Sequence, residues 1–255
     1  MVAGGMLGRL GLGAGPIDAL TRAARVADAR VLATIDRMGE PAADVPAAEA
    51  ATGSYLTLLD LADRAGIAED LDLSLRLPTV GQQMPRNGGK IAYENAAEIC
   101  ARAAALGATV TLAAPGSAAV DAALATLAEL RRDVPTTGVT LCATLARTPA
   151  DCRDLARSGA RVRLRSGAPG GAGGRQYAVC VGILMAGSGY PMIATRDPRL
   201  LALTTRLAVH VGRRRDSFEL QTVRGTPGRL HRRLAADGYR TRIRAAYGPV
   251  PPGRG

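Results

Sequence analysis

The sequence predicts an α/β protein, a distorted (β/α)8 barrel of the TIM type that lacks the last helix, and three observations support this fold class. Eight short runs typical of strands alternate strictly with seven helical stretches. The length of 255 residues suits one such domain, and no long linker divides it. The first strand is not followed by the glycine-rich fingerprint of a doubly wound dinucleotide-binding sheet, which is the main alternative architecture.

The expected strands are short runs that are apolar throughout or alternate between apolar and polar residues. In chain order they are VLATI (31–35), LDLSLRL (71–77), TVTLAA (109–114), VTLCATL (139–145), RVRLR (161–165), YPMIAT (190–195), FELQTV (218–223) and TRIRAA (241–246). The expected helices between them are 47–65, 90–106, 118–132, 149–157, 175–186, 198–211 and 227–236, and a further helix near 16–28 precedes the first strand. Proline at the first helical position marks two of the starts, at Thr148-Pro149 and Asp197-Pro198.

These elements divide the chain into an N-terminal helical segment (1–28), a barrel (29–248) and a disordered tail (249–255). Hydrophobic residues make up 47% of the chain, enough for a core, yet no run approaches the roughly 20 apolar residues that span a bilayer. The first residues lack the pattern of a secretory signal, so we expect a cytoplasmic protein. The four cysteines form no C-x-x-C pair, and we expect small core residues there and no metal site.

The positive charge of the chain is concentrated near its end. The net charge is +11, and residues 196–255 contain 14 arginines against four carboxylates, a local balance of +10. Lys90 is the only lysine, so nearly every cation is a guanidinium group, which suits bidentate anion contacts. The presence of any single surface arginine is explained equally well by the general abundance of arginine in this chain as by an anion-binding role.

Strand alternation predicts an arginine-lined interior, because barrel strands send every second side chain into the lumen. Leucines fill one face of LDLSLRL, which leaves Arg76 on the lumen side with Asp72 and Ser74. The same parity places four further arginines inside: Arg163, Arg165, Arg242 and Arg244. The acids available to them are few, with Asp72, Glu219 and Asp197 as the candidates. Buried cations without partners are costly, so we expect a bound anion at the barrel mouth. A shift of one residue would instead turn these arginines to solvent.

Several long blocks, in the right order, resemble the FAD-dependent proline dehydrogenases, especially the single-function bacterial type. The blocks are LDLSLRLPTVGQ with GGKIAYENAAEICARA, ADCRDLARSGARVRL, ILMAGSGYPMIATRDPRL and SFELQ. The similarity extends over about residues 17–248. It implies a barrel that binds FAD noncovalently at the strand carboxyl ends, oxidises L-proline to Δ1-pyrroline-5-carboxylate in proline catabolism and passes electrons to a membrane quinone. It also implies a location that can be peripheral to the membrane.

The resemblance assigns roles to particular residues. Arg76 stands where the family has the lysine that meets the substrate carboxylate, and Arg244 stands at the strand-eight position beside the substrate. The residues expected to contact FAD are Arg163, Ser166, Gly167, Ala168, Thr195, Arg196 and Gln221. No residue is identified as catalytic.

The chain also departs from the family pattern. Ser166 replaces the fifth-strand lysine, Cys142 replaces a flavin-contacting glutamine, and Arg244 replaces a tyrosine. The sequence ends at Gly255, so we interpret it as truncated, without the closing helix whose arginine pair clamps the proline carboxylate. Because a bidentate clamp both binds and orients, its loss is expected to weaken turnover. The exposed barrel edge would then be covered by the N-terminal helix or by a partner chain.

Three hypotheses for the function follow. The first is a proline dehydrogenase, fully or weakly active, that acts on L-proline or another small carboxylate. The second is a catalytically inactive barrel relative, a pseudoenzyme that binds an anion or a flavin. The third is a nucleic-acid-binding protein that uses Arg213, Arg214, Arg215, Arg229, Arg232 and Arg233. The third is the least favoured, because one Phe and no Trp provide few surfaces for base stacking.

Overall fold

The computed structural model describes residues 12–13, 15–27, 29–114, 117–166, 173–222 and 229–249. Strands run at β1 (Leu12–Gly13), β2 (Val31–Arg37), β3 (Leu71–Leu75), β4 (Thr109–Ala113), β5 (Gly138–Cys142), β6 (Arg161–Arg165), β7 (Tyr190–Ala194), β8 (Glu219–Gln221) and β9 (Arg240–Tyr247). The α-helices are α2 (Pro16–Ala27), α3 (Val45–Arg64), α4 (Gly88–Ala105), α5 (Ser117–Asp133), α6 (Thr148–Arg157), α7 (Gly173–Ala186), α8 (Pro198–His210) and α9 (Arg229–Ala236). Two short 3-10 helices are η1 (Ala68–Asp70) and η2 (Leu77–Val80).

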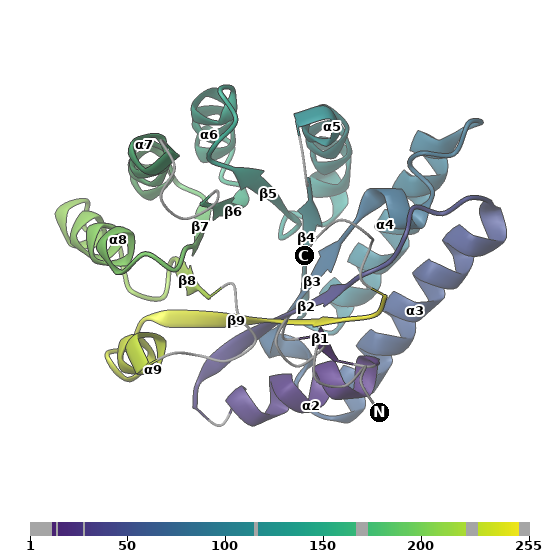
Figure 1. Ribbon diagram of the computed structural model, residues 1–255, viewed down its shortest axis with the longest axis horizontal. Coiled ribbons are helices and arrows are strands. Elements are labelled where there is room, and N and C mark those ends of the chain that lie inside the picture. The colour runs from purple at the N-terminus through teal and green to yellow at the C-terminus, as the bar shows by residue number, and fades with distance from the viewer. Residues whose placement is uncertain are drawn as a thin grey trace.

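The strands form a closed parallel barrel, as the sequence predicts. Each strand from β2 to β8 pairs with the next, and β9 closes the ring by pairing with both β8 and β2. The pairing of β9 with β2 runs from Val31 opposite Thr241 to Arg37 opposite Tyr247. The helices surround this ring (Figure 1). The short β1 adds to the end of β9, a feature that the sequence did not indicate.

The predicted elements are confirmed, with differences at their ends. The strand RVRLR has the predicted bounds of 161–165. The expected strand 71–77 ends earlier, at Leu75, because Pro78 lies in the 3-10 turn that follows it. The strand expected at 218–223 is observed over Glu219–Gln221 alone, and Val223 lies outside the described residues. Asp197 begins α8 as expected, since its side chain accepts a hydrogen bond of 2.8 Å from the backbone N–H of Arg199.

Helix α2 covers the seam where the barrel closes. It packs on β2 and β9, and Arg22 Nη2 donates a 2.7 Å hydrogen bond to the carbonyl of Ala246. The sequence analysis left two candidates for covering the barrel edge, the N-terminal helix and a partner chain. The structure places the N-terminal helix there. Within the described part of the chain, β9 is followed by Gly248 and Pro249, so no helix after β9 is observed there.

Side chains of alternate strand residues separate an apolar outer layer from a polar lumen. Leu71, Leu73 and Leu75 of β3 and Val162 and Leu164 of β6 are buried and belong to the hydrophobic core that includes the helices. The intervening residues point inward, and many of them are buried and polar: Thr34, Asp36, Asp72, Ser74, Thr111, Thr140, Arg163, Glu219, Gln221 and Arg242. The predicted strand parity is correct, and the lumen is filled by charged groups in place of the usual branched apolar side chains.

Candidate active site at the carboxyl ends of the barrel strands

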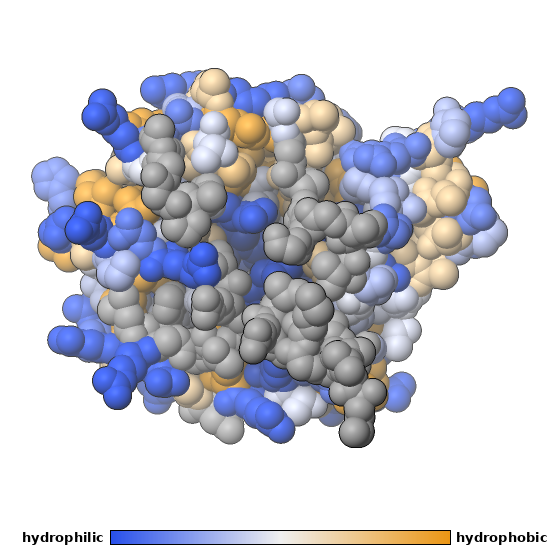
Figure 2. Space-filling view, viewed as in Figure 1, coloured by the Kyte–Doolittle hydropathy of each residue, from blue (hydrophilic) through white to orange (hydrophobic). Residues whose placement is uncertain are grey.

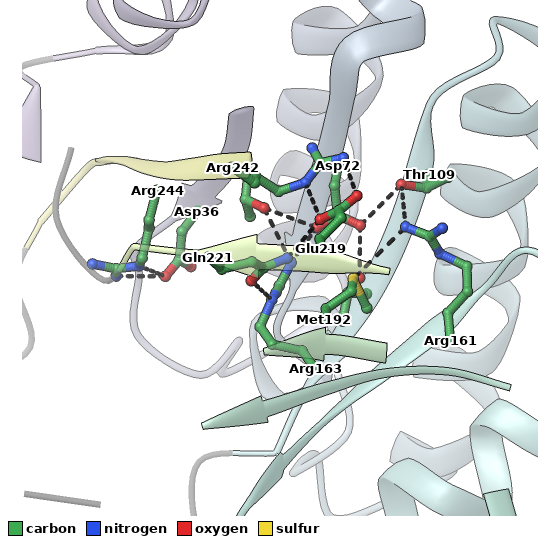
Figure 3. Close-up of polar contacts among 12 residues, drawn as sticks. Asp36, Asp72, Thr109, Arg161, Arg163, Met192, Glu219, Gln221, Arg242 and Arg244 are labelled. Atoms are coloured by element: carbon green, nitrogen blue, oxygen red, sulfur yellow. Dashed lines mark hydrogen bonds and ion pairs between the residues drawn. The ribbon is translucent and has the colours of Figure 1, made fainter. Parts of the chain in front are cut away.

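Asp36, near the end of β2, binds two arginines that come from neighbouring strands. Arg76 follows β3, and its Nε and Nη2 lie 3.2 and 3.1 Å from the two carboxylate oxygens of Asp36. Arg244 of β9 donates from Nε to Asp36 Oδ2 over 2.7 Å. Figure 3 shows Arg244 turned toward Asp36. The structure thus brings together the two arginines that were expected to bind the substrate carboxylate, around an acid that the sequence analysis did not single out.

The charge of Asp36 is held by these arginines. Burial of this carboxyl group would raise its pKa, but the guanidinium groups of Arg244 and Arg76 outweigh burial and lower the pKa below its usual value. Asp36 is therefore ionised at neutral pH. Two cations and one anion leave a net positive charge at this part of the mouth, and both arginines remain partly accessible, with 15% and 35% of the Arg76 and Arg244 side chains exposed.

Arg163 lies deeper in the lumen and is bound on several sides. Its Nε donates to Gln221 Oε1 over 2.8 Å, and its Nη2 donates to Asp72 Oδ2 over 2.5 Å. The same Nη2 lies 3.1 Å from the hydroxyl oxygen of Thr34. Asp72 is fully buried, which would raise its pKa, but the charges of Arg163, Arg242 and Arg161 together outweigh burial and lower the pKa.

A second ion pair, between Arg242 and Glu219, continues this network across the barrel (Figure 3). Arg242 donates from Nε and Nη2 to the two oxygens of Glu219 over 2.7 and 2.9 Å. Gln221 links the pairs, because its Nε2 donates to Glu219 over 2.9 Å while its carbonyl oxygen accepts from Arg163. Burial opposes ionisation of Glu219, but the charge of Arg242 lowers its pKa to about 2.

The expectation that the lumen arginines lack partners is wrong, whereas a bound anion at the mouth stays a prediction. Arg163 and Arg242 are paired with Asp72 and Glu219, and the two arginines nearer the mouth share Asp36. The expected acid Asp197 is not in this network, because it caps helix α8. Arg165, which was also expected in the lumen, is exposed at the end of β6.

The residues predicted to contact the flavin lie around the same end of the barrel, with two outside the described part. Ser166 follows β6 and is half-buried, and its backbone N–H donates to the carbonyl of Ala194 over 3.2 Å. Thr195 is buried and Arg196 exposed directly after β7, while Gln221 ends β8. The predictions for Gly167 and Ala168 fall outside the described residues.

The side chains at the mouth fit the donor requirements of a flavin. Thr140 points into the lumen from β5, and its buried hydroxyl has no hydrogen-bond partner among the residues that the structure describes. The Thr195 oxygen accepts from the backbone N–H of Asp197 over 3.1 Å, which leaves the hydroxyl proton of Thr195 for donation. Hydroxyl donors suit the carbonyl groups of a flavin ring, and the exposed guanidinium of Arg196 suits a phosphate. Figure 2 shows hydrophilic atoms in the hollow at the middle of this face of the molecule.

Three of the arginines proposed for nucleic-acid binding make contacts within the fold. Arg213 donates to the backbone carbonyls of Met185 and Gly189 over 2.9 and 3.0 Å. Arg214 pairs with Asp216, and Arg215 lies over the ring of Tyr239, with its guanidinium carbon 4.9 Å from the ring centre. Arg213 is thereby bound to the fold, whereas Arg214 and Arg215 remain exposed, so the nucleic-acid hypothesis stays a prediction.

The lowered pKa values predict a dependence of stability on acid. A carboxylate whose pKa is lower in the folded state contributes stability that is present above its unfolded pKa and is lost as the pH falls through its folded pKa. For Glu219 this window extends from 4.5 down to about 2. We expect the free energy of unfolding, measured by urea denaturation, to fall across that window, and to fall less in Glu219→Gln. A free energy that stays constant between these pH values would contradict the ion-pair assignment.

Fold and site together define a (β/α)8 barrel protein with a cluster of arginines around Asp36 near the carboxyl ends of its strands. No protein-family model matches the chain. The chain is 29% identical over 205 residues to the proline dehydrogenase of Deinococcus radiodurans, which corresponds to 76% of this chain and 66% of that protein. This similarity, together with the closed barrel, indicates a relative of the proline dehydrogenases.

Solved structures of proline utilization A share the fold. The structure from Bdellovibrio bacteriovorus, inactivated by N-propargylglycine, superimposes with a TM-score of 0.82 over 93% of this chain at 16% identity. A substituted form from Bradyrhizobium japonicum gives a TM-score of 0.74 over 92% of this chain at 20% identity. The chain spans only 30% and 28% of those two proteins, and slightly less than two-thirds of the curated relative.

Proposed function

We propose that this barrel is a flavin-dependent oxidoreductase that oxidises L-proline, or another small carboxylate, with Arg76 and Arg244 as the carboxylate receptor. The observation that carries the proposal is the pair of guanidinium groups held together by Asp36 at the barrel mouth. The described bonds to Asp36 use the Nε and Nη2 atoms of both arginines, so the two Nη1 groups can donate to a substrate.

FAD would be held by Arg163, Ser166, Gly167, Ala168, Thr195, Arg196 and Gln221, and when bound it would supply the hydride acceptor for the ring carbon that is next to the amine and does not carry the carboxylate. The arginine pair fixes the carboxylate and so orients that carbon. Because the pKa of Asp36 is held low, Asp36 stays ionised and acts by orienting Arg76 and Arg244, not as a proton acceptor. The proposal includes a membrane quinone as electron acceptor and a cytoplasmic location, which can be peripheral to the membrane.

In the described residues, no helix combines the length and apolar character that crossing a membrane demands.

The test is to purify the full chain and record its absorbance spectrum, before and after addition of FAD. We expect the paired visible bands of a bound flavin, and we expect L-proline to reduce an electron-accepting dye in proportion to the bound FAD. A colourless protein that also fails to take up added FAD would refute the proposal. D-proline provides the control, because it has the same functional groups and the opposite configuration.

A second candidate, a catalytically inactive barrel, is favoured by one observation. Asp36 already occupies one edge of both carboxylate-binding arginines, so the fold satisfies them without a ligand. This candidate predicts that FAD binds while L-proline neither reduces the dye nor changes the flavin spectrum. The same two measurements therefore separate the two functions.

A further inference from the structure

The side chain of Asp72 is the most enclosed charged group in the lumen. Its exposed fraction is 0%, and it accepts hydrogen bonds from the hydroxyls of Thr109, Thr111 and Thr34 over 3.0, 2.6 and 3.2 Å. Its Oδ2 also accepts from Arg163. A carboxylate with this many donors is rigid and remains ionised, because each bond favours the charged form.

Arg163 is oriented by this carboxylate. A guanidinium group has five N–H donors, and the contacts to Gln221, Thr34 and Asp72 use the Nε and Nη2 donors. Within the described residues, Nη1 has no hydrogen-bond partner. The planar guanidinium group is thereby fixed. Its Nε and Nη2 atoms face the ion-pair network, and Nη1 can donate hydrogen bonds to another group.

We propose that Asp72 is a positioning residue of the flavin site, which fixes Arg163 in one orientation and compensates its charge, so that Nη1 offers hydrogen-bond donors without adding net charge. This inference rests on the proposed function and extends it to a residue that the resemblance does not assign. The aspartate belongs to β3 and the arginine to β6, and the contact crosses the lumen instead of joining neighbouring strands.

Charge compensation has a measurable consequence for the flavin. A two-electron-reduced flavin is more negative than the oxidised form, so an uncompensated cation nearby favours reduction. Removing one negative charge within roughly 10 Å, at an effective dielectric constant of about 20, changes such an equilibrium about tenfold. For a two-electron couple, a tenfold change corresponds to about 30 mV.

The test is the flavin midpoint potential, measured by equilibration with a reference dye, in the FAD-loaded full chain. We expect Asp72→Asn to raise the potential by about 30 mV, because Arg163 then retains its charge without a counterion. In the double variant Asp72→Asn/Arg163→Gln, which is again neutral at this point, we expect a value close to wild type. A merely structural role would not reverse the shift when a second residue is replaced. A potential that is unchanged in Asp72→Asn, or equally shifted in the double variant, overturns the inference.

A second variant tests the orientation of Arg163 and is expected to fold, because it keeps the charge beside Asp72. Arg163→Lys loses the planar fork, and we expect the dissociation constant of FAD to increase about tenfold while the potential stays unchanged. An unchanged dissociation constant overturns the orienting role. Asp216→Asn, in an exposed ion pair, is the control and should alter neither quantity. A wild-type chain that takes up no FAD overturns the proposed function as well, whereas normal FAD binding with unresponsive variants overturns only the role of Asp72.

Discussion

Replacement of Glu219 by alanine is expected to lower the free energy of unfolding by about 3–5 kcal/mol, because it leaves a buried arginine without its counterion. Arg242 has only 5% of its side chain exposed, and Glu219 accepts from both its Nε and its Nη2. The other hydrogen bonds of Arg242 within the described residues go to the neutral carbonyls of Ala33 and Asp70, and the more distant charge of Asp72 compensates Arg242 only in part. Urea denaturation of wild type and variant at neutral pH measures the difference.

The matched control is Asp216→Ala, which removes one partner of an ion pair whose arginine side chain is 82% exposed. That change should cost less than about 1 kcal/mol, because exposed pairs are weak. The double variant Glu219→Leu/Arg242→Met removes both charges and is expected to recover most of the stability. Equal losses in Glu219→Ala and Asp216→Ala would show that the Glu219 pair is not buried as described.

The second large effect is expected on catalysis, where Arg244→Met should lower kcat/KM for L-proline about 100-fold through loss of a charge-assisted carboxylate contact. Folding should be affected less, because Arg244 has 35% of its side chain exposed and Asp36 keeps Arg76 as a partner. Steady-state dye reduction measures kcat/KM, and urea denaturation measures stability in the same samples.

Arg240 offers a matched control on the same strand. It begins β9, whereas Arg244 lies closer to the strand's carboxyl end, and it is exposed. Arg240→Met should therefore leave kcat/KM near the wild-type value. If both variants lose activity equally, or if Arg244→Met keeps full activity, the carboxylate receptor lies elsewhere.

The sequence predicts the architecture well, because alternation is a strong signal in a closed barrel. In RVRLR the apolar Val162 and Leu164 face the helices and Arg163 faces the lumen, as strand parity requires. The eight barrel strands and the helix over the seam follow from the same kind of pattern. The parity argument therefore places Arg76, Arg163 and Arg244 inside before any contact is known.

The acids that neutralise these arginines are harder to predict. Asp36 is 40 residues from Arg76 and 208 residues from Arg244, so no local pattern links them. The expected first strand ended at 35, two residues before the observed end at Arg37, and this excluded Asp36 from the lumen. The alternation of Thr34 and Asp36 in VLATIDR is the signal that would have included it.

The expectation that the lumen arginines lack acidic partners failed for the same reason. Side chains on strands that are distant in sequence meet across a barrel, and pairing by charge there depends on register. Asp72 and Glu219 were recognised as inward-facing acids. The set of acids weighed against the arginines, however, omitted Asp36 and included Asp197. The observed pairing makes the interior a network of ion pairs, with net positive charge remaining near Arg76 and Arg244.

The most direct test of the account is anaerobic addition of L-proline to the FAD-loaded chain, followed by absorbance. If the guanidinium pair on Asp36 holds the substrate at the flavin, the visible flavin bands of the wild type should fade as proline is added, and those of Arg244→Met should fade only at much higher concentrations. Bands that persist in the wild type at every proline concentration, with FAD fully bound, would contradict the account.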